Sequence, residues 1–137
     1  MPDFKFGEIT EKIIGAAFRV HNTLGTGFQE VIYQRVMQIK FRRLPLEHAR
    51  EFEMPIHYLD ELIGTRRVDF LVCNQISVEL KAVTKLDDIN MAQAINYLEA
   101  YNLEVGMLIN FGSKRLEYHR FKNKNTIQIL LTILNIE

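Results

Sequence analysis

The chain has 137 residues, of which 25% are charged and 47% are hydrophobic; this composition is typical of a soluble globular protein and excludes a low-complexity or fibrous chain. The formal net charge is zero, which argues against a protein that holds duplex DNA by electrostatic attraction alone. The length predicts one domain over residues 1–137, too short for two separate cores.

No apolar run approaches the roughly 18 residues that cross a bilayer, and the polar start at residues 1–5 does not resemble a secretory signal. We therefore expect a cytoplasmic protein without a membrane segment.

Along the chain, apolar residues first recur at intervals of three and four and later alternate, so helical periodicity gives way to strand periodicity. Pro45 ends the second helical pattern, while Pro55 and Gly64 suggest an edge strand and a bulge. The C-terminal segment over residues 126–136 is apolar and is compatible with either a helix or a strand. The predicted strands cover residues 49–58, 62–72, 76–81, 105–111 and 116–121. Helices are predicted over residues 7–24 and 29–43, and a third helix is predicted to begin after an N-cap at Asp87 or Asp88 and to run to about residue 101. This ααβββαββ order, with the C-terminal segment added, predicts an α/β or α+β domain with a mixed central sheet flanked by helices.

The second and third predicted strands, over residues 62–72 and 76–81, lie so close together that they predict a hairpin. A three-residue connection at residues 73–75 places Phe70 opposite Val78, and Val68 opposite Leu80. These four residues form one wholly apolar face. A slip of one residue would destroy that face, so we expect this register.

The same register places two acidic residues opposite each other on the polar face. Asp69 faces Glu79 with Cβ atoms roughly 5 Å apart, and Lys81 lies one step further along. Like charges at this distance repel unless a positive group lies between them, and a hard cation such as Mg²⁺ or Mn²⁺ accepts carboxylate and carbonyl oxygens. We therefore predict one or two metal ions held by Asp69 and Glu79, with the carbonyl of Leu80 as an extra ligand and Lys81 beside the attacking water. The simpler alternative is a surface salt-bridge ladder, which would contribute little stability.

An acidic residue on one strand followed by Glu-x-Lys on the next resembles the signature of the PD-(D/E)XK nuclease superfamily. The segment Gly27-Phe28-Gln29-Glu30-Val31-Ile32-Tyr33 also matches the motif of the GxxExxY family, small bacterial and archaeal proteins assigned to that superfamily. The segment Gln93-Ala94-Ile95-Asn96-Tyr97 resembles the Gln-x-x-x-Tyr helix of nuclease domains in recombination helicase-nucleases. Val68 stands where the superfamily name has proline. The resemblance to the GxxExxY family runs from about residue 9 to residue 118, and it implies a nuclease-like core.

The resemblance also implies roles for residues outside the hairpin. Glu30 would join Asp69, Glu79 and Lys81 as a catalytic residue, although a first-turn glutamate is also expected simply to favour the positive end of a helix. Substrate-binding or supporting roles are expected for a further set, in which the tyrosines have the alternative of core packing and the arginines that of solvated charge: Tyr33, Gln93, Tyr97, Arg66 and Arg67.

The leading prediction is therefore metal-dependent hydrolysis of phosphodiester bonds in nucleic acid, DNA rather than RNA, with Mg²⁺ or Mn²⁺ as cofactor. The alternative is an inactive nucleic-acid-binding or accessory module of a larger assembly, which the neutral charge and small size favour. A homodimer is compatible with cutting two strands, by analogy with the superfamily.

Overall fold

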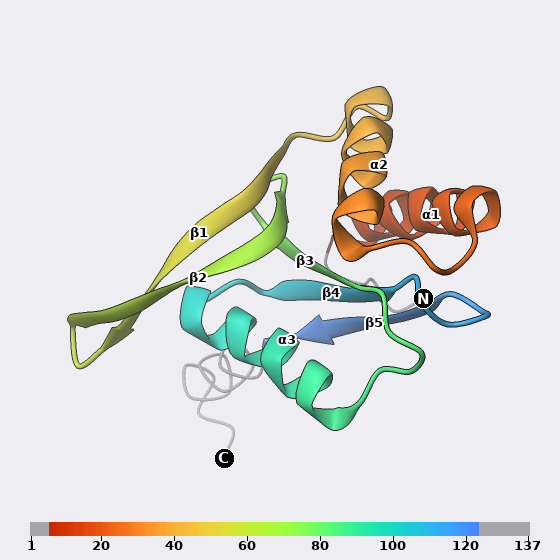
Figure 1. The fold of residues 1–137 in the computed structure, drawn as a ribbon. Coiled ribbons are helices and arrows are strands. Elements are labelled where there is room, and N and C mark those ends of the chain that lie inside the picture. The colour runs from red at the N-terminus through yellow and green to blue at the C-terminus, as the bar shows by residue number, and fades with distance from the viewer. Residues whose placement is uncertain (1–5, 124–137) are drawn as a thin grey trace, which may run out of the picture.

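The computed structural model describes residues 6–123 and shows a five-stranded mixed sheet between helices (Figure 1). The predicted element order is confirmed, and the ends differ from the predicted ones by at most one residue. The C-terminal segment over residues 126–136 lies outside the described residues. Across residues 6–123, none of the helices is long and apolar enough to cross a membrane. The elements are α1 (Gly7–Leu24), α2 (Glu30–Arg43), β1 (His48–Tyr58), β2 (Glu61–Val72), β3 (Ile76–Lys81), α3 (Asp88–Tyr101), β4 (Val105–Asn110) and β5 (Glu117–Lys122).

The sheet has the order β1-β2-β3-β4-β5, in which only β3 and β4 run parallel. A parallel pair needs a crossover, and α3 supplies it between β3 and β4. The predicted hairpin register is confirmed where Phe70 faces Val78, and the regular pairing ends there, before the predicted pair of Val68 and Leu80. The bulge is also confirmed, because Ile56 of β1 faces Gly64 whereas the next residue faces Leu62. The edge position predicted from Pro55 agrees with the place of β1 at one end of the sheet.

The helices cover opposite faces of this sheet (Figure 1). The apolar faces of α1 and α2 pack on the side of the sheet that carries the inward residues of the hairpin. Leu108, which alternates with the residues facing α1 and α2, packs on the other side against Ala94 of α3. The larger core cluster joins α1, α2 and the sheet through Ile13, Ala16, Ala17, Val20, Tyr33, Met37, Phe41, Phe70, Val72, Ile76, Val78, Leu80, Val105, Met107, Ile109 and Phe111, with Leu46 after α2.

Helix ends are formed by local chemistry that the sequence contains. Gly25 ends α1 with a φ of +68°, and its N–H donates to the carbonyl of His21. Asp87 caps α3 in a capping box with Asn90, which confirms Asp87 rather than Asp88 as the cap. These caps determine where α1 ends and where α3 begins after β3.

Candidate active site

The candidate site lies where β2 and β3 stop pairing regularly. Beyond Phe70 and Val78, carboxylates replace the main-chain partners of two N–H groups. The N–H of Leu80 donates to Oδ2 of Asp69 at 2.7 Å, and the N–H of Asp69 donates to Oε1 of Glu79 at 3.2 Å. The prediction that Asp69 and Glu79 lie together is therefore confirmed, and their carboxylates are built into the join between the strands.

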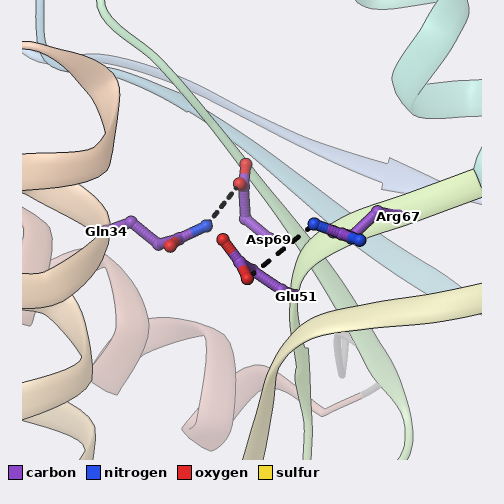
Figure 2. A network of polar contacts seen from close by, with 4 residues as sticks. All are labelled: Gln34, Glu51, Arg67 and Asp69. Carbon is purple, nitrogen blue, oxygen red and sulfur yellow. Dashed lines mark hydrogen bonds and ion pairs between the residues drawn. The ribbon is translucent and has the colours of Figure 1, made fainter.

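Helix α2 also fixes the Asp69 side chain, through Gln34. Nε2 of Gln34 donates to Oδ1 of Asp69 at 2.8 Å, as Figure 2 shows. Each oxygen of Asp69 thus accepts one hydrogen bond, which orients the carboxylate and leaves further lone pairs on both oxygens.

Burial makes these carboxylates difficult to ionise. It raises the pKa of Glu79 to about 8, and the nearby charge of Asp69 adds to the rise. Burial also raises the pKa of Asp69, although the hydrogen bonds from Leu80 and Gln34 oppose that rise. The site is therefore short of positive charge.

Glu30 and Lys81 belong to the same electrostatic group. Glu30 is solvent-exposed, but its neighbours remove enough water to raise its pKa, and the charge of Asp69 contributes to the same rise. Lys81 lowers the pKa of Glu30, Asp69 and Glu79 and is thus the cation common to all three. The structure places these four predicted catalytic residues around one position. Their catalytic roles stay a prediction.

Helix α3 and the two arginines flank the site on its other side. The guanidinium of Arg66 lies over the ring of Tyr97, 4.1 Å from its centroid, and the Tyr97 hydroxyl donates to the carbonyl of Arg67 at 3.3 Å. The side chain of Arg67 lies 3.9 Å from Glu51. Burial raises the pKa of Tyr97 to about 12, and the charge of Glu79 adds to the rise. Tyr97 and Glu79 are therefore near neighbours.

The other predicted supporting residues lie in different surroundings. Tyr33 is fully buried, stacks on Phe111 and donates its hydroxyl to the carbonyl of Gly25 at 2.6 Å. This tyrosine therefore holds the turn that precedes Glu30, which is a supporting position rather than a substrate contact. Gln93 is partly buried on α3, one turn before Tyr97, and its role stays a prediction.

Two residues of the site were not found by sequence reasoning. Gln34 lies one helical turn after Glu30, so the spacing alone could have placed both on one face. Glu51 comes from β1, and its position depends on the β1–β2 register, which the sequence did not specify even though Gly64 indicated a bulge. Glu30, Gln34, Glu51 and Asp69, with Val31, line a cavity of about 200 Å³.

The donor set suits a hard cation with several water ligands. Within residues 6–123, no group of three or more His, Cys, Asp or Glu side chains is gathered closely enough to hold a metal ion. Mg²⁺ requires less, because it is commonly bound through one or two carboxylates and keeps much of its water shell. Asp69 and Glu79, which lie side by side, partly buried and with raised pKa values, fit this requirement.

Comparison with known proteins agrees with this geometry. The family model described as the PD-(D/E)XK nuclease superfamily matches residues 7–121, a range that includes every element described above except the last residue of β5. A solved structure titled "Crystal structure of SSO0001" is similar in fold, with a TM-score of 0.52 and 17% sequence identity, over 96% of this chain and 68% of that chain. No curated protein matches the sequence. The family model covers most of the chain, and strands β2 and β3 of the chain carry the acidic pair and the lysine. The chain therefore belongs to the PD-(D/E)XK nuclease superfamily.

Proposed function

We propose that the protein hydrolyses phosphodiester bonds of nucleic acid, and that Asp69, Glu79 and Lys81 carry the reaction. Membership of the superfamily suggests nuclease activity, with nucleic acid as substrate and a divalent metal as the typical cofactor. The observation that carries the proposal is the exchange of carboxylate and main-chain hydrogen bonds between Asp69, Glu79 and Leu80, which holds two acidic groups rigidly beside one lysine.

Asp69 and Glu79 would hold Mg²⁺ or Mn²⁺, and the carbonyl of Leu80 is a suitable further ligand. In a strand the N–H and C=O of one residue point to the same side, and the N–H of Leu80 points to Asp69. When bound there, a divalent cation lowers the pKa of a coordinated water and offsets negative charge on the phosphate.

Lys81 would orient the attacking water or donate to a phosphate oxygen. Its ammonium is the positive group that acts on all three acidic neighbours, so it adds charge where negative charge develops. Glu30 would complete the acidic group at the edge open to solvent. Arg66, Arg67, Gln93 and Tyr97 would contact or support the substrate strand, while Tyr33 would hold the turn before Glu30.

We further propose that the chain is a member of the GxxExxY family, on the strength of its motif over residues 27–33. A preference for DNA, a cytoplasmic location and a homodimer that places two sites on a duplex belong to the same proposal. The competing function is an accessory module that binds nucleic acid without cutting it, which the zero net charge favours.

A cleavage assay tests the proposal and its competitor together. The wild-type chain is incubated with single-stranded, duplex and branched DNA and with RNA, in Mg²⁺, Mn²⁺ or EDTA. We expect metal-dependent cleavage that falls about 10²-fold or more in Glu79→Ala and Lys81→Ala. Lys85→Ala is the matched control and keeps its activity, because Lys85 is an exposed lysine in the loop after β3, four residues beyond Lys81. Binding without cleavage of any substrate by the wild type would contradict hydrolysis and support the accessory function.

A further inference from the structure

A further cavity lies between α3 and the β1–β2 hairpin. It has a volume of about 210 Å³, and its walls are mostly apolar. Figure 1 shows the hairpin extending away from the rest of the sheet, with the C-terminal end of α3 beside it. The cavity is lined by Ile56 of β1, Arg66 of β2, and Asn96, Tyr97, Ala100 and Tyr101 of α3. Its shape therefore depends on how α3 is held against the hairpin.

Two tyrosine hydroxyls hold α3 against both strands of the hairpin. Tyr97 donates to the carbonyl of Arg67 on β2 at 3.3 Å, and Tyr101 donates to the carbonyl of Pro55 on β1 at 2.9 Å. Tyr97 is only 4% exposed, so its ring is fixed by the atoms around it. The walls of the cavity are thus formed before any ligand binds, which reduces the entropy that binding costs.

The cavity contains a planar cationic group suited to stacking. The guanidinium of Arg66 lies over the ring of Tyr97, 4.1 Å from the ring centroid, and the same side chain lines the cavity. A planar guanidinium held over one ring can stack a second flat ring on its other face, as arginines do with unstacked nucleobases. Ile56 and Ala100 add apolar surface to the same cavity. A flat heterocycle fits this combination of groups.

The polar groups of the cavity suit the edge of such a heterocycle. Asn96 is exposed, and its amide carries both donors and an acceptor, which is the pattern that pairs with base edges. The only charged residue of the lining is Arg66, whereas the cavity beside Asp69 is lined by three acidic residues. A cation therefore suits the acidic cavity, and an uncharged ring on a negatively charged backbone suits the cavity at Arg66.

The cavity adjoins the proposed catalytic centre. Burial raises the pKa of Glu79, and the charge of Arg66 is one of the influences that oppose the rise. Burial also raises the pKa of Tyr97, and the charge of Glu79 adds to that rise. Arg66 and Tyr97 are thus both near neighbours of Glu79. A strand whose phosphate lies at Asp69 and Glu79 therefore has a base within reach of the cavity.

We propose that this cavity binds one unpaired nucleobase of the substrate strand, stacked on Arg66 and hydrogen-bonded by Asn96. The inference deepens the proposed function and rests on it only for the position of the scissile phosphate. A base inside a duplex is stacked on both faces and paired along its edge, so it must leave its partner before it enters a pocket. The substrate class is therefore single-stranded nucleic acid, or a duplex at an unpaired position.

The test measures binding by fluorescence anisotropy in EDTA, where a metal-dependent reaction does not proceed. The labelled probes are a short deoxythymidine oligonucleotide and an abasic strand of the same length, which carries the same phosphates without bases. Ala100→Phe fills the cavity with a phenyl ring and removes no hydrogen-bonding side chain. Thr23→Phe, at an exposed position of α1, is the matched control. Urea denaturation checks that each full-length variant is folded.

We expect the wild type to bind the deoxythymidine strand at least about fivefold more tightly than the abasic strand, the lower end of the effect of stacking one base. Ala100→Phe should bind both strands as the wild type binds the abasic strand, and Thr23→Phe should keep the preference. Asn96→Ala should weaken binding of the deoxythymidine strand by about twofold or more without affecting the abasic strand.

Equal affinities of the wild type for the two strands would overturn the inference, and so would a base preference that is undiminished in Ala100→Phe. Metal-dependent cleavage alongside either result would leave the proposed function intact. A base preference that is lost in Ala100→Phe, with no cleavage in Mg²⁺, would support the inference and contradict the proposed hydrolysis.

Discussion

Two polar clusters lie side by side in the sheet, and they differ in whether their hydrogen bonds are complete. The first is the acidic site around Asp69 and Glu79, and the second surrounds Asn110 at the end of β4. They are adjacent, because Lys81 at the end of β3 pairs with Asn110. Only the acidic site combines raised pKa values with an unpartnered buried oxygen.

Asn110 is fully buried and uses both ends of its amide. Its Oδ1 accepts from the N–H groups of Val83 and Gly112 at 3.0 Å each. Its Nδ2 donates to the carbonyl of Val83 at 2.8 Å and to Glu117 at 3.0 Å. This network, which includes the Glu117 carboxylate, joins the loop after β3 to the end of β4. A polar cluster whose groups are all hydrogen-bonded to one another stabilises the fold. A cluster of acidic groups that lacks positive charge is instead suited to bind a cation.

The largest effect on stability is expected at Asn110. Asn110→Ala leaves the N–H groups of Val83 and Gly112 and the carbonyl of Val83 without their partner. We expect the free energy of unfolding to fall by about 3–5 kcal/mol, measured by urea denaturation. Asn22→Ala, at an exposed position on α1, is the control and should change it by less than about 1 kcal/mol. Equal effects of the two substitutions would show that the network is not a stabilising element.

A side chain added at Gly112 would crowd the same network. A Cβ at this position would lie 2.4 Å from both the N and the O of Val83, which are main-chain atoms that cannot rotate away. We expect Gly112→Ala to lower the free energy of unfolding by about 2–3 kcal/mol. Gly64 offers the matched control, because a Cβ there meets nothing within 4 Å. A Gly112→Ala protein as stable as Gly64→Ala would mean that the loop after β3 moves aside freely.

The fold was predictable because local patterns and register agreed. The alternation on both arms of the hairpin admitted one register with a wholly apolar face, and Phe70 does face Val78. The same register brought Asp69 and Glu79 together, so the centre of the site followed from sequence.

The rest of the site was harder to predict from the sequence, because it depends on contacts between elements that are distant in sequence. Glu51 reaches Asp69 only through the β1–β2 pairing, which shifts by one residue beside Gly64. Gln34 reaches Asp69 because α2 packs across the sheet, and no local pattern gives that packing. The sequence predicts a substrate-binding or supporting role for Tyr33, and only its hydrogen bond to Gly25 distinguishes these two roles.

The acidic site should make stability depend on pH in the absence of metal. The pKa of Glu79 rises from its ordinary value of 4.5 to about 8 in the folded chain, so the folded state binds its proton more tightly than the unfolded state. The stability from this group is complete below pH 4.5 and is lost as the pH rises towards 8. We expect a slope of at most about 1.4 kcal/mol per pH unit in that range.

Denaturation of the metal-free chain between pH 5 and 8 measures this slope. Glu79→Gln should flatten it, because glutamine does not titrate. Added Mg²⁺ should also flatten it by favouring the ionised carboxylate. An unchanged slope in Glu79→Gln would mean that another group governs the dependence.

The smallest change in stability is expected at Gln34, although it is as buried as many core residues. Gln34→Met loses the hydrogen bond to Asp69, worth about 1.5–3 kcal/mol for a charged acceptor, but it also removes an unpartnered carbonyl that costs about 1–3 kcal/mol. The two terms nearly cancel, so the free energy of unfolding should change by less than about 1 kcal/mol. Cleavage should nevertheless fall, because Asp69 loses the donor that orients its carboxylate. A loss of stability as large as that of Asn110→Ala would remove the distinction between the two clusters, since Gln34 would then stabilise the fold as Asn110 does.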